Sequence, residues 1–207
     1  MAAPYNIVVI VGSLRKESYT LKVANALAKL APDTLKLDVT TLHGISFFNQ
    51  DLEAAPPADW LAFREKLQKS DGVLFVTPEY NRSIPGALKN AIDWASRPWG
   101  QNSFDHVPAG VIGASVGSIG TALGQQSLRS VLSFCNARQM TAPEAYIHYT
   151  PEKFSATGEV IDESTEMFLR NYLQEFHDHV VRVLTVLPRS CRNRGLNRHR
   201  RWLPVSS

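Results

Sequence analysis

Two short apolar runs are the clearest pattern in the chain. Residues 5–11 (YNIVVIV) and 73–76 (VLFV) are rich in β-branched and aromatic side chains and do not alternate with polar ones. Runs of this length and composition are typical of strands that a parallel sheet buries on both faces. Two further runs, 35–42 (LKLDVTTL) and 107–114 (VPAGVIGA), also predict strands.

A fifth strand is predicted over residues 140–148, interrupted by Pro143. Because proline has no amide hydrogen to give to a neighbouring strand, this segment is expected at the edge of the sheet. Between and after the strands, apolar side chains recur at helical spacing, which predicts five helices. These helices cover residues 20–31, 59–69, the segment from Pro85-Gly86 to Ala95, residues 121–135 and residues 163–187.

Strands that alternate with helices in this way predict a single α/β domain over residues 1–187. The expected architecture is a doubly wound, five-stranded parallel sheet of order 2-1-3-4-5 with helices on both faces. In such a sheet the loops that follow strands one, three and four meet where the strand order reverses. The loops around Ser13, Tyr80 and Ser115 are therefore expected to form one site.

The loop after the first strand, GSLRKES (12–18), brings hydroxyls and Arg15 to the start of a helix. Free amides at a helix N-terminus attract an anion, and an arginine can make paired charge-assisted bonds to a phosphate. An alternative is that Ser18 only caps the helix while Arg15 is solvated. The loop has neither GxxxxGK[ST] nor GxGxxG, so a P-loop hydrolase and a dinucleotide fingerprint are both disfavoured.

The loop after residues 73–76 is longer than a simple turn requires. It contains Glu79, Tyr80, Asn81, Arg82 and Ser83 between a strand and a helix. Ligands of open α/β sheets lie beyond the carboxyl ends of the strands, so this segment is predicted to bind one. In the third loop, Gly117 and Gly120 permit close approach of a ligand, or only a tight turn.

The two segments GSLRKES (12–18) and PEYNRSIPGALKNAIDW (78–94) closely resemble the NAD(P)H-dependent FMN reductases. This is a flavodoxin-like group that includes bacterial quinone, azo-dye and chromate reductases. The resemblance extends over residues 5–187, and the second motif is long and specific. It implies a flavodoxin-like fold and bound FMN, with the phosphate in the first loop, the ring against the second, and the third loop approaching the far side of the ring.

The resemblance implies the following cofactor-binding residues: Ser13, Arg15, Lys16, Ser18, Tyr19 and Thr20; Pro78, Glu79, Tyr80, Asn81 and Arg82; Ala114, Ser115 and Gly117. One position departs from the family pattern, since Thr20 stands where the family has Asn. The resemblance also implies that NADPH or NADH gives hydride to the flavin, which then reduces a quinone, azo compound, chromate or free flavin. Because the flavin carries the chemistry, no catalytic acid or base is expected.

Family members form homodimers or homotetramers, with the ring pocket near a subunit boundary. Trp94 and Trp99 are either interface residues or core aromatics. Two other functions are possible for this fold. One is a flavodoxin-type electron carrier that binds FMN without using NAD(P)H. The other is a binding protein without flavin.

Several polar residues invite a catalytic interpretation that their positions do not favour. Glu79, in a turn, more often holds backbone groups than acts as a base, and Lys89 with Asp93 is spaced as a surface pair. His177 and His179 fall on different faces of one helix, which disfavours a shared metal. Neither Cys135 nor Cys191 lies near another ligand at metal-binding spacing, so no metal is predicted.

The net charge of +3 conceals an uneven distribution. Residues 188–207 contain six arginines and no acidic residue, whereas residues 1–187 carry 16 Lys and Arg against 19 Asp and Glu, a net charge of −3. We expect residues 188–207 to be a disordered basic tail. Arginines alone attract polyanions without reading a sequence, so no specific nucleic-acid partner is predicted.

The chain has no apolar run long enough to cross a membrane and no pattern typical of a signal peptide at its N-terminus. A cytoplasmic protein without a membrane partner is therefore expected. Its expected partners are a nicotinamide nucleotide and a small-molecule electron acceptor.

Overall fold

The computed structural model describes residues 3–190. Strands and helices alternate along the chain as predicted, with one short 3-10 helix, η1, in the connection after the second strand. The elements are β1 (Tyr5–Val11), α1 (Tyr19–Leu30), β2 (Leu35–Thr41), η1 (Gln50–Leu52), α2 (Ala58–Lys69), β3 (Gly72–Thr77), α3 (Gly86–Ala95), β4 (Pro108–Ser115), α4 (Ala122–Phe134), β5 (Arg138–Gln139), β6 (Ala145–His148) and α5 (Glu163–Val186).

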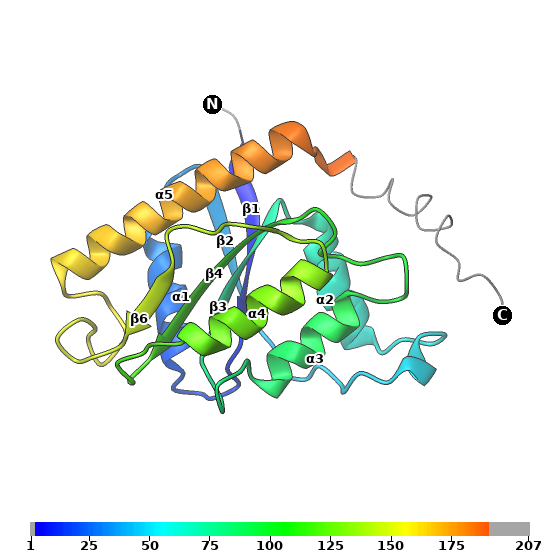
Figure 1. Ribbon diagram of the computed structural model, residues 1–207, viewed down its shortest axis with the longest axis horizontal. Helices are drawn as coiled ribbons and strands as arrows, with labels where there is room; N and C mark the ends of the chain where they lie inside the picture. The colour runs from blue at the N-terminus through cyan, green and yellow to red at the C-terminus, as the bar shows by residue number, and fades with distance from the viewer. Residues whose placement is uncertain (1–2, 191–207) are drawn as a thin grey trace.

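The strands form one parallel sheet of order β2-β1-β3-β4-β5, and β6 also pairs with β4. This order confirms the predicted doubly wound, flavodoxin-like arrangement. Val11 at the end of β1 lies level with Thr41 on β2 and with Val76 on β3. Because the strands are parallel and in this register, their carboxyl ends lie at the same end of the sheet, which faces the bottom of Figure 1. This end is called the carboxyl edge below.

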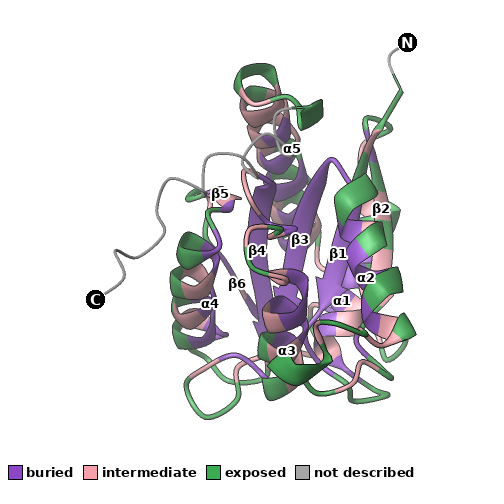
Figure 2. Cartoon of the chain, turned by 90° about the vertical axis from the view of Figure 1, so that its right-hand side faces the viewer, coloured by how far each residue is buried: buried purple, intermediate pink, exposed green. Residues whose placement is uncertain are grey.

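Helices cover both faces of the sheet (Figure 1), and each face has its own apolar core. On one face, α1 and α5 pack on the sheet through residues such as Leu27 and Phe176. On the other face, α2, α3 and α4 pack through Leu67, Leu88 and Leu128. The central strand β3 is buried throughout, and β1 and β4 are buried over most of their length, whereas exposed residues lie on the outer sides of the helices and in the loops (Figure 2). The unbroken apolar runs predict this burial.

The fifth strand is interrupted near Pro143, as predicted, but its first piece lies before the predicted segment over residues 140–148. The strand is split into β5 and β6, and residues 140–144 lie between the two. Pro143 lies in this gap and has no amide hydrogen to donate to β4. Among the described residues both pieces pair only with β4, so the predicted edge position is confirmed.

The beginning of the predicted tail is part of the described structure. Arg189 forms an ion pair with Asp71, with 3.2 Å between nitrogen and oxygen. Residues 191–207, and with them Cys191 and most of the predicted basic tail, lie outside the described residues. Within residues 3–190 no helix has both the length and the apolar content needed to cross a bilayer.

Gly113 on β4 lies where the start of α4 packs tightly against the sheet. A Cβ atom at this position would lie 2.6 Å from the carbonyl oxygen of Thr77 and would overlap the side chain of Thr121. We predict that Gly113→Ala lowers the free energy of unfolding by about 1–3 kcal/mol, because backbone atoms must move to admit the methyl group. The measurement is urea unfolding followed by circular dichroism.

Gly86→Ala is the matched control for this substitution. A Cβ atom at Gly86, the first residue of α3, meets nothing within 4 Å. The change should alter the free energy of unfolding by less than about 1 kcal/mol, since alanine favours a helix more than glycine does. Equal losses in both variants would contradict the packing argument.

Candidate functional site

The loop after β1 is held together by its own hydroxyl groups. Ser18 caps α1 by accepting a hydrogen bond from the amide of Leu21 at 3.3 Å, so the capping interpretation is confirmed. The Ser18 hydroxyl also lies 2.7 Å from the Thr20 hydroxyl, and both side chains are buried. Ser13 accepts from the amide of Arg15 at 3.2 Å. Three hydroxyls are thus fixed within a few residues of a helix N-terminus.

Arg15 is exposed, yet its side chain is held in place. Its Nη2 donates to the carbonyl oxygen of Glu17, and its guanidinium lies 4.7 Å from the centre of the Tyr19 ring. Arg15 is thus exposed to solvent, as the alternative expects, and it also has contacts within its own loop. Because the guanidinium is held beside an aromatic ring, its N–H donors stay close to the loop. An anion bound at the helix N-terminus could accept hydrogen bonds from them. Lys16 is exposed beside it.

The loop after β3 contains a tight hairpin turn. Tyr80 and Ser83 exchange two backbone hydrogen bonds of 3.0 Å across this turn. The two residues at its centre, Asn81 and Arg82, have φ angles of 51° and 64°. Asparagine tolerates this left-handed conformation, but for arginine it is unusual. Backbone strain of this kind is concentrated at functional sites.

Glu79 connects this loop to α4. One oxygen of its carboxylate accepts hydrogen bonds from the amides of Leu123 at 3.1 Å and Gly124 at 2.9 Å, in the first turn of the helix. The other oxygen lies 3.6 Å from the guanidinium of Arg82. The prediction that Glu79 holds backbone groups is confirmed. Both oxygens of its carboxylate are thus engaged within the described structure.

The first and second loops meet directly. The hydroxyls of Ser13 and Tyr80, which are 67 residues apart in sequence, lie 3.4 Å from one another. Gly12 allows this approach, because a Cβ atom there would lie 3.2 Å from both Pro78 and Leu88. The structure therefore brings together the two loops that the strand order was predicted to combine.

The third loop starts at the end of β4. Ala114 is buried, and the hydroxyl of Ser115 accepts a hydrogen bond from the amide of Gly117 at 3.0 Å. Exposed apolar side chains gather on the three loops and the start of α4. They are Leu14, Tyr80, Val116, Ile119 and Leu123. The carboxyl edge of the sheet thus combines fixed hydroxyls with an apolar rim.

Two residues of this edge were missed by the sequence analysis, His148 and Tyr149 at the end of β6. His148 Nε2 lies 3.1 Å from the carbonyl oxygen of Val116 in the third loop. Tyr149 packs against Tyr19 with 4.6 Å between ring centres, and its buried hydroxyl has no hydrogen-bond partner among the described residues. Burial raises the pKa of this hydroxyl, and Tyr19 adds to the effect. The strand order itself was the signal, since β6 ends at the same edge.

Other residues considered in the sequence take structural roles. Lys89 and Asp93 form a pair with 2.7 Å between nitrogen and oxygen, as predicted. Trp94 is completely buried and donates to the carbonyl oxygen of Ser46 at 2.7 Å, so an interface role for it is wrong. Trp99 is 73% exposed.

The histidines of α5 face different partners. His177 lies 2.9 Å from the carboxylate of Asp178, and His179 lies 2.7 Å from the carbonyl oxygen of Arg138. Burial is the main cause that lowers the pKa of His179. Residues 3–190 contain no group of three or more His, Cys, Asp or Glu placed to hold a metal ion.

Comparison with known proteins gives consistent results. A family model described as NADPH-dependent FMN reductase matches residues 5–152. A quinone reductase of Pseudomonas putida is 45% identical over 177 residues, which is 85% of this chain and 95% of the relative. A 2-hydroxy-1,4-benzoquinone reductase of a Burkholderia species is 42% identical over 170 residues, or 82% of this chain and 93% of the relative.

A similar solved structure is FerB of Paracoccus denitrificans, described as a flavoenzyme NAD(P)H:(acceptor) oxidoreductase. It has a TM-score of 0.81 and 44% sequence identity, and the match covers 86% of this chain and 98% of FerB.

The role of Glu79 in joining the second loop to α4 can be tested by Glu79→Ala. Two amides then lose their charged acceptor, and we predict that the free energy of unfolding falls by about 1–3 kcal/mol. Thermal and urea unfolding measure the change. Glu17→Ala is the control, since the Glu17 side chain is 72% exposed. If Glu79→Ala were as stable as the control, the hydrogen bonds to α4 would not hold the loop.

Proposed function

The chain belongs to the NADPH-dependent FMN reductase family, and we propose that it transfers hydride from NADPH or NADH, through bound FMN, to a quinone. It is an oxidoreductase of the quinone reductase type. The observation that carries the proposal is the meeting of Ser13 and Tyr80 at the carboxyl edge of the sheet. This contact supports the proposal because the loop that would bind the phosphate then lies beside the loop that would bind the ring.

The donor groups of the first loop suit a terminal phosphate. Hydroxyls of Ser13, Ser18 and Thr20, the guanidinium of Arg15 and the amides that begin α1 can surround a phosphate monoester from several sides. A pyrophosphate usually lies against a glycine-rich backbone, which this loop lacks. We propose that Lys16 and Tyr19 complete this phosphate site.

The second and third loops are proposed to hold the ring. Pro78, Glu79, Tyr80, Asn81 and Arg82 would lie along one side of it, and Ala114, Ser115 and Gly117 would approach the other. FMN, when bound, supplies the hydride transfer between the nicotinamide and the acceptor.

The protein itself provides placement and polarity. The tight turn at Asn81 and Arg82 fixes the direction of the backbone amides, and Glu79 fixes the turn against α4. We propose no catalytic acid or base, because the Glu79 carboxylate is already bound to amides.

The rim of the site favours a quinone as acceptor over chromate. A planar apolar molecule would contact exposed side chains such as Leu14, Val116 and Ile119. Chromate is a small dianion that would gain little from such contacts and would lose its hydration beside them. Azo compounds share the planar apolar character of quinones and remain candidates, and free flavin would fit for the same reason.

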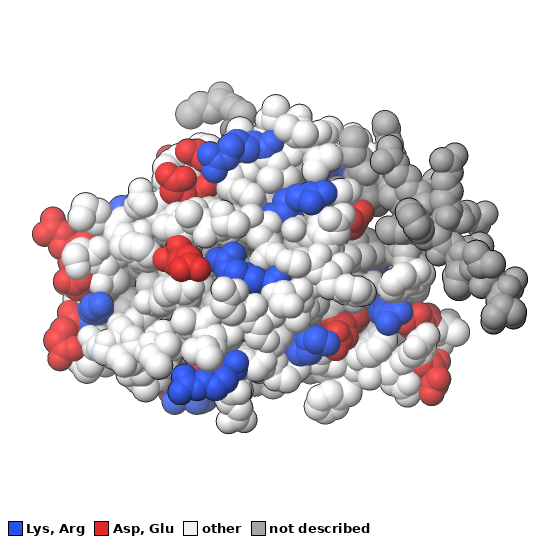
Figure 3. Space-filling model, viewed as in Figure 1, with Lys and Arg blue, Asp and Glu red and all other residues white. Residues whose placement is uncertain are grey.

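A flavodoxin-type electron carrier is the alternative function. Carriers of that kind usually expose a strongly acidic surface. In Figure 3, lysines and arginines are interspersed with acidic residues over the face in view. This mixed charge distribution does not favour the carrier function. Steady-state oxidation of NADH or NADPH in the presence of a quinone is expected of the reductase and not of the carrier.

We further propose that the chain forms a homodimer or homotetramer and acts in the cytoplasm. Apolar side chains at the mouth of the site, such as Val116, Ile119 and Leu123, would be partly covered by a second subunit. The use of NAD(P)H supports the location. Light scattering coupled to size-exclusion chromatography measures the oligomeric state, and a monomer would contradict the proposed homodimer or homotetramer.

The activity can be tested with one absorbance experiment. The protein as purified, or after incubation with FMN, should show a flavin band, and this band should bleach when NADPH or NADH is added without oxygen. A quinone added afterwards should restore it. A flavin band that neither nucleotide bleaches would favour the carrier, and a protein that takes up no FMN would contradict both.

Arg15→Ala tests the phosphate site. Loss of one bidentate charge-assisted contact should weaken FMN binding about 10- to 100-fold, measured by quenching of flavin fluorescence. The free energy of unfolding without FMN should change by less than about 1 kcal/mol, because Arg15 is exposed. Arg170→Ala on α5 is the control, and equal FMN affinity in both variants would contradict the assignment.

A further inference from the structure

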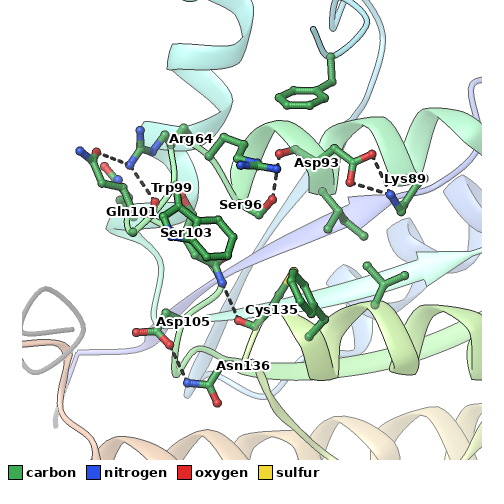
Figure 4. A pocket seen from close by; sticks show the side chains of 18 of the residues that line it. Arg64, Lys89, Asp93, Ser96, Trp99, Gln101, Ser103, Asp105, Cys135 and Asn136 are labelled. Atoms are coloured by element: carbon green, nitrogen blue, oxygen red, sulfur yellow. Dashed lines mark hydrogen bonds and ion pairs between the residues drawn. The ribbon is translucent and has the colours of Figure 1, made fainter. Parts of the chain in front are cut away.

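A cavity lies at the C-terminal ends of α3 and α4, away from the proposed FMN site. Its volume is about 1090 Å³, and it is enclosed by the last turns of these helices, by α2 and by the connection over residues 96–105 (Figure 4). Helix α4 starts beside Glu79 and ends at Phe134, which lines the cavity. Thirteen residues of helix span about 20 Å, so this cavity is separate from the proposed FMN site.

The cavity contains a buried guanidinium without a carboxylate partner. Arg64 on α2 is only 9% exposed. Its Nη2 donates to the backbone and side-chain oxygens of Gln101, at 2.9 and 2.8 Å, and its Nε has no hydrogen-bond partner among the described residues. Burial lowers the pKa of Arg64, but an arginine remains charged at neutral pH. A positive charge is therefore held in the wall with only neutral acceptors.

The other cations of the wall already have acidic partners. Lys89 pairs with Asp93 at 2.7 Å, and Arg189 pairs with Asp71 at 3.2 Å. Arg97 lies 3.9 Å from the carboxylate of Glu53.

The acids that line the cavity are likewise engaged. Asp93 is paired with Lys89, and Asp105 accepts a hydrogen bond from Asn136 at 2.7 Å. Among residues 3–190, Arg64 is thus the lining cation for which no ion pair is formed. A buried charge of this kind favours a ligand that brings the opposite charge.

The rest of the cavity wall includes a polar residue, Ser103, and aromatic side chains. Ser103 is buried, and its hydroxyl has no hydrogen-bond partner among the described residues. Trp99 and Phe134 are exposed at the cavity, at 73% and 78%, and Phe48 lines it as well. The guanidinium of Arg97 lies 5.6 Å from the Trp99 ring. Aromatic walls with a few polar groups are typical of sites for small organic molecules.

We propose that this cavity binds a planar aromatic molecule that carries one carboxylate. The carboxylate pairs with the guanidinium of Arg64, and the ring lies against Trp99. The volume admits a molecule of this size, and the ligand neutralises the charge that the protein leaves uncompensated. The site is independent of the FMN site, so it stands whether or not the proposed acceptor is correct.

Benzoate is the probe for this proposal, with benzamide as its uncharged analogue. The FMN-loaded, full-length protein is titrated with each compound, and the indole N–H signal of Trp99 is followed by nuclear magnetic resonance. Trp99→Phe identifies the signal by its loss. Benzoate should shift it saturably, and benzamide should bind at least about 10-fold more weakly, because a charge-assisted pair is lost.

Three variants locate the carboxylate. Arg64→Gln should weaken benzoate binding about 10-fold or more, and Arg64→Lys should weaken it less because the charge remains. Ser103→Ala is the control, because the Ser103 hydroxyl is fully buried and has no hydrogen-bond partner in the described structure. The fold and the benzoate affinity should both be retained in this variant. If Arg64→Gln fails to fold, the comparison of benzoate with benzamide in the unmodified protein keeps the test valid.

Several results would overturn the proposal. One is a Trp99 signal that benzoate does not shift saturably, as when a second subunit covers the cavity. Another is equal affinity for benzoate and benzamide, and a third is unchanged benzoate affinity in folded Arg64→Gln. Inorganic phosphate that competes fully with benzoate would show a general anion site without selectivity for an aromatic ring, which also contradicts the proposal.

Discussion

The whole site depends on the pairing of β1 with β3. Val11 lies level with Val76, and the amide of Gly12 donates to the Val76 carbonyl at 2.9 Å, so both strands end at the same height. Only then can the hydroxyls of Ser13 and Tyr80 lie 3.4 Å apart. A shift of one strand by a single residue would turn every side chain of the buried run to the opposite face, so both apolar cores oppose it.

The two loops joined in this way are stabilised by different means. The first is held by its own hydroxyls and by the cap of α1, so it is rigid before any ligand arrives. The second is a strained turn at Asn81 and Arg82, and Glu79 fastens it to the amides of α4. The same carboxylate occupies the helix N-terminus that could otherwise attract an anion. In the proposed function, the anion therefore binds at α1, and the mononucleotide takes one orientation.

The sequence predicted the sheet order, the five helices and the meeting of the loops, because apolar runs and strand-order rules determine these features. It predicted that Pro143 interrupts the last strand, but not that the first piece would end before Met140, since propensities do not reveal where pairing stops within a mixed segment. His148 and Tyr149 were missed because they bear no motif. The uncompensated charge of Arg64 was invisible in the sequence, since the partners of a buried cation are set by packing between distant elements.

The central claim is that the loop after β1 binds the phosphate of a mononucleotide. Its most direct test compares the affinity of the unmodified protein for FMN and for riboflavin, which lacks the phosphate, by quenching of flavin fluorescence. Several charge-assisted hydrogen bonds predict that FMN binds at least about 100-fold more tightly. Equal affinities for the two flavins would contradict the account.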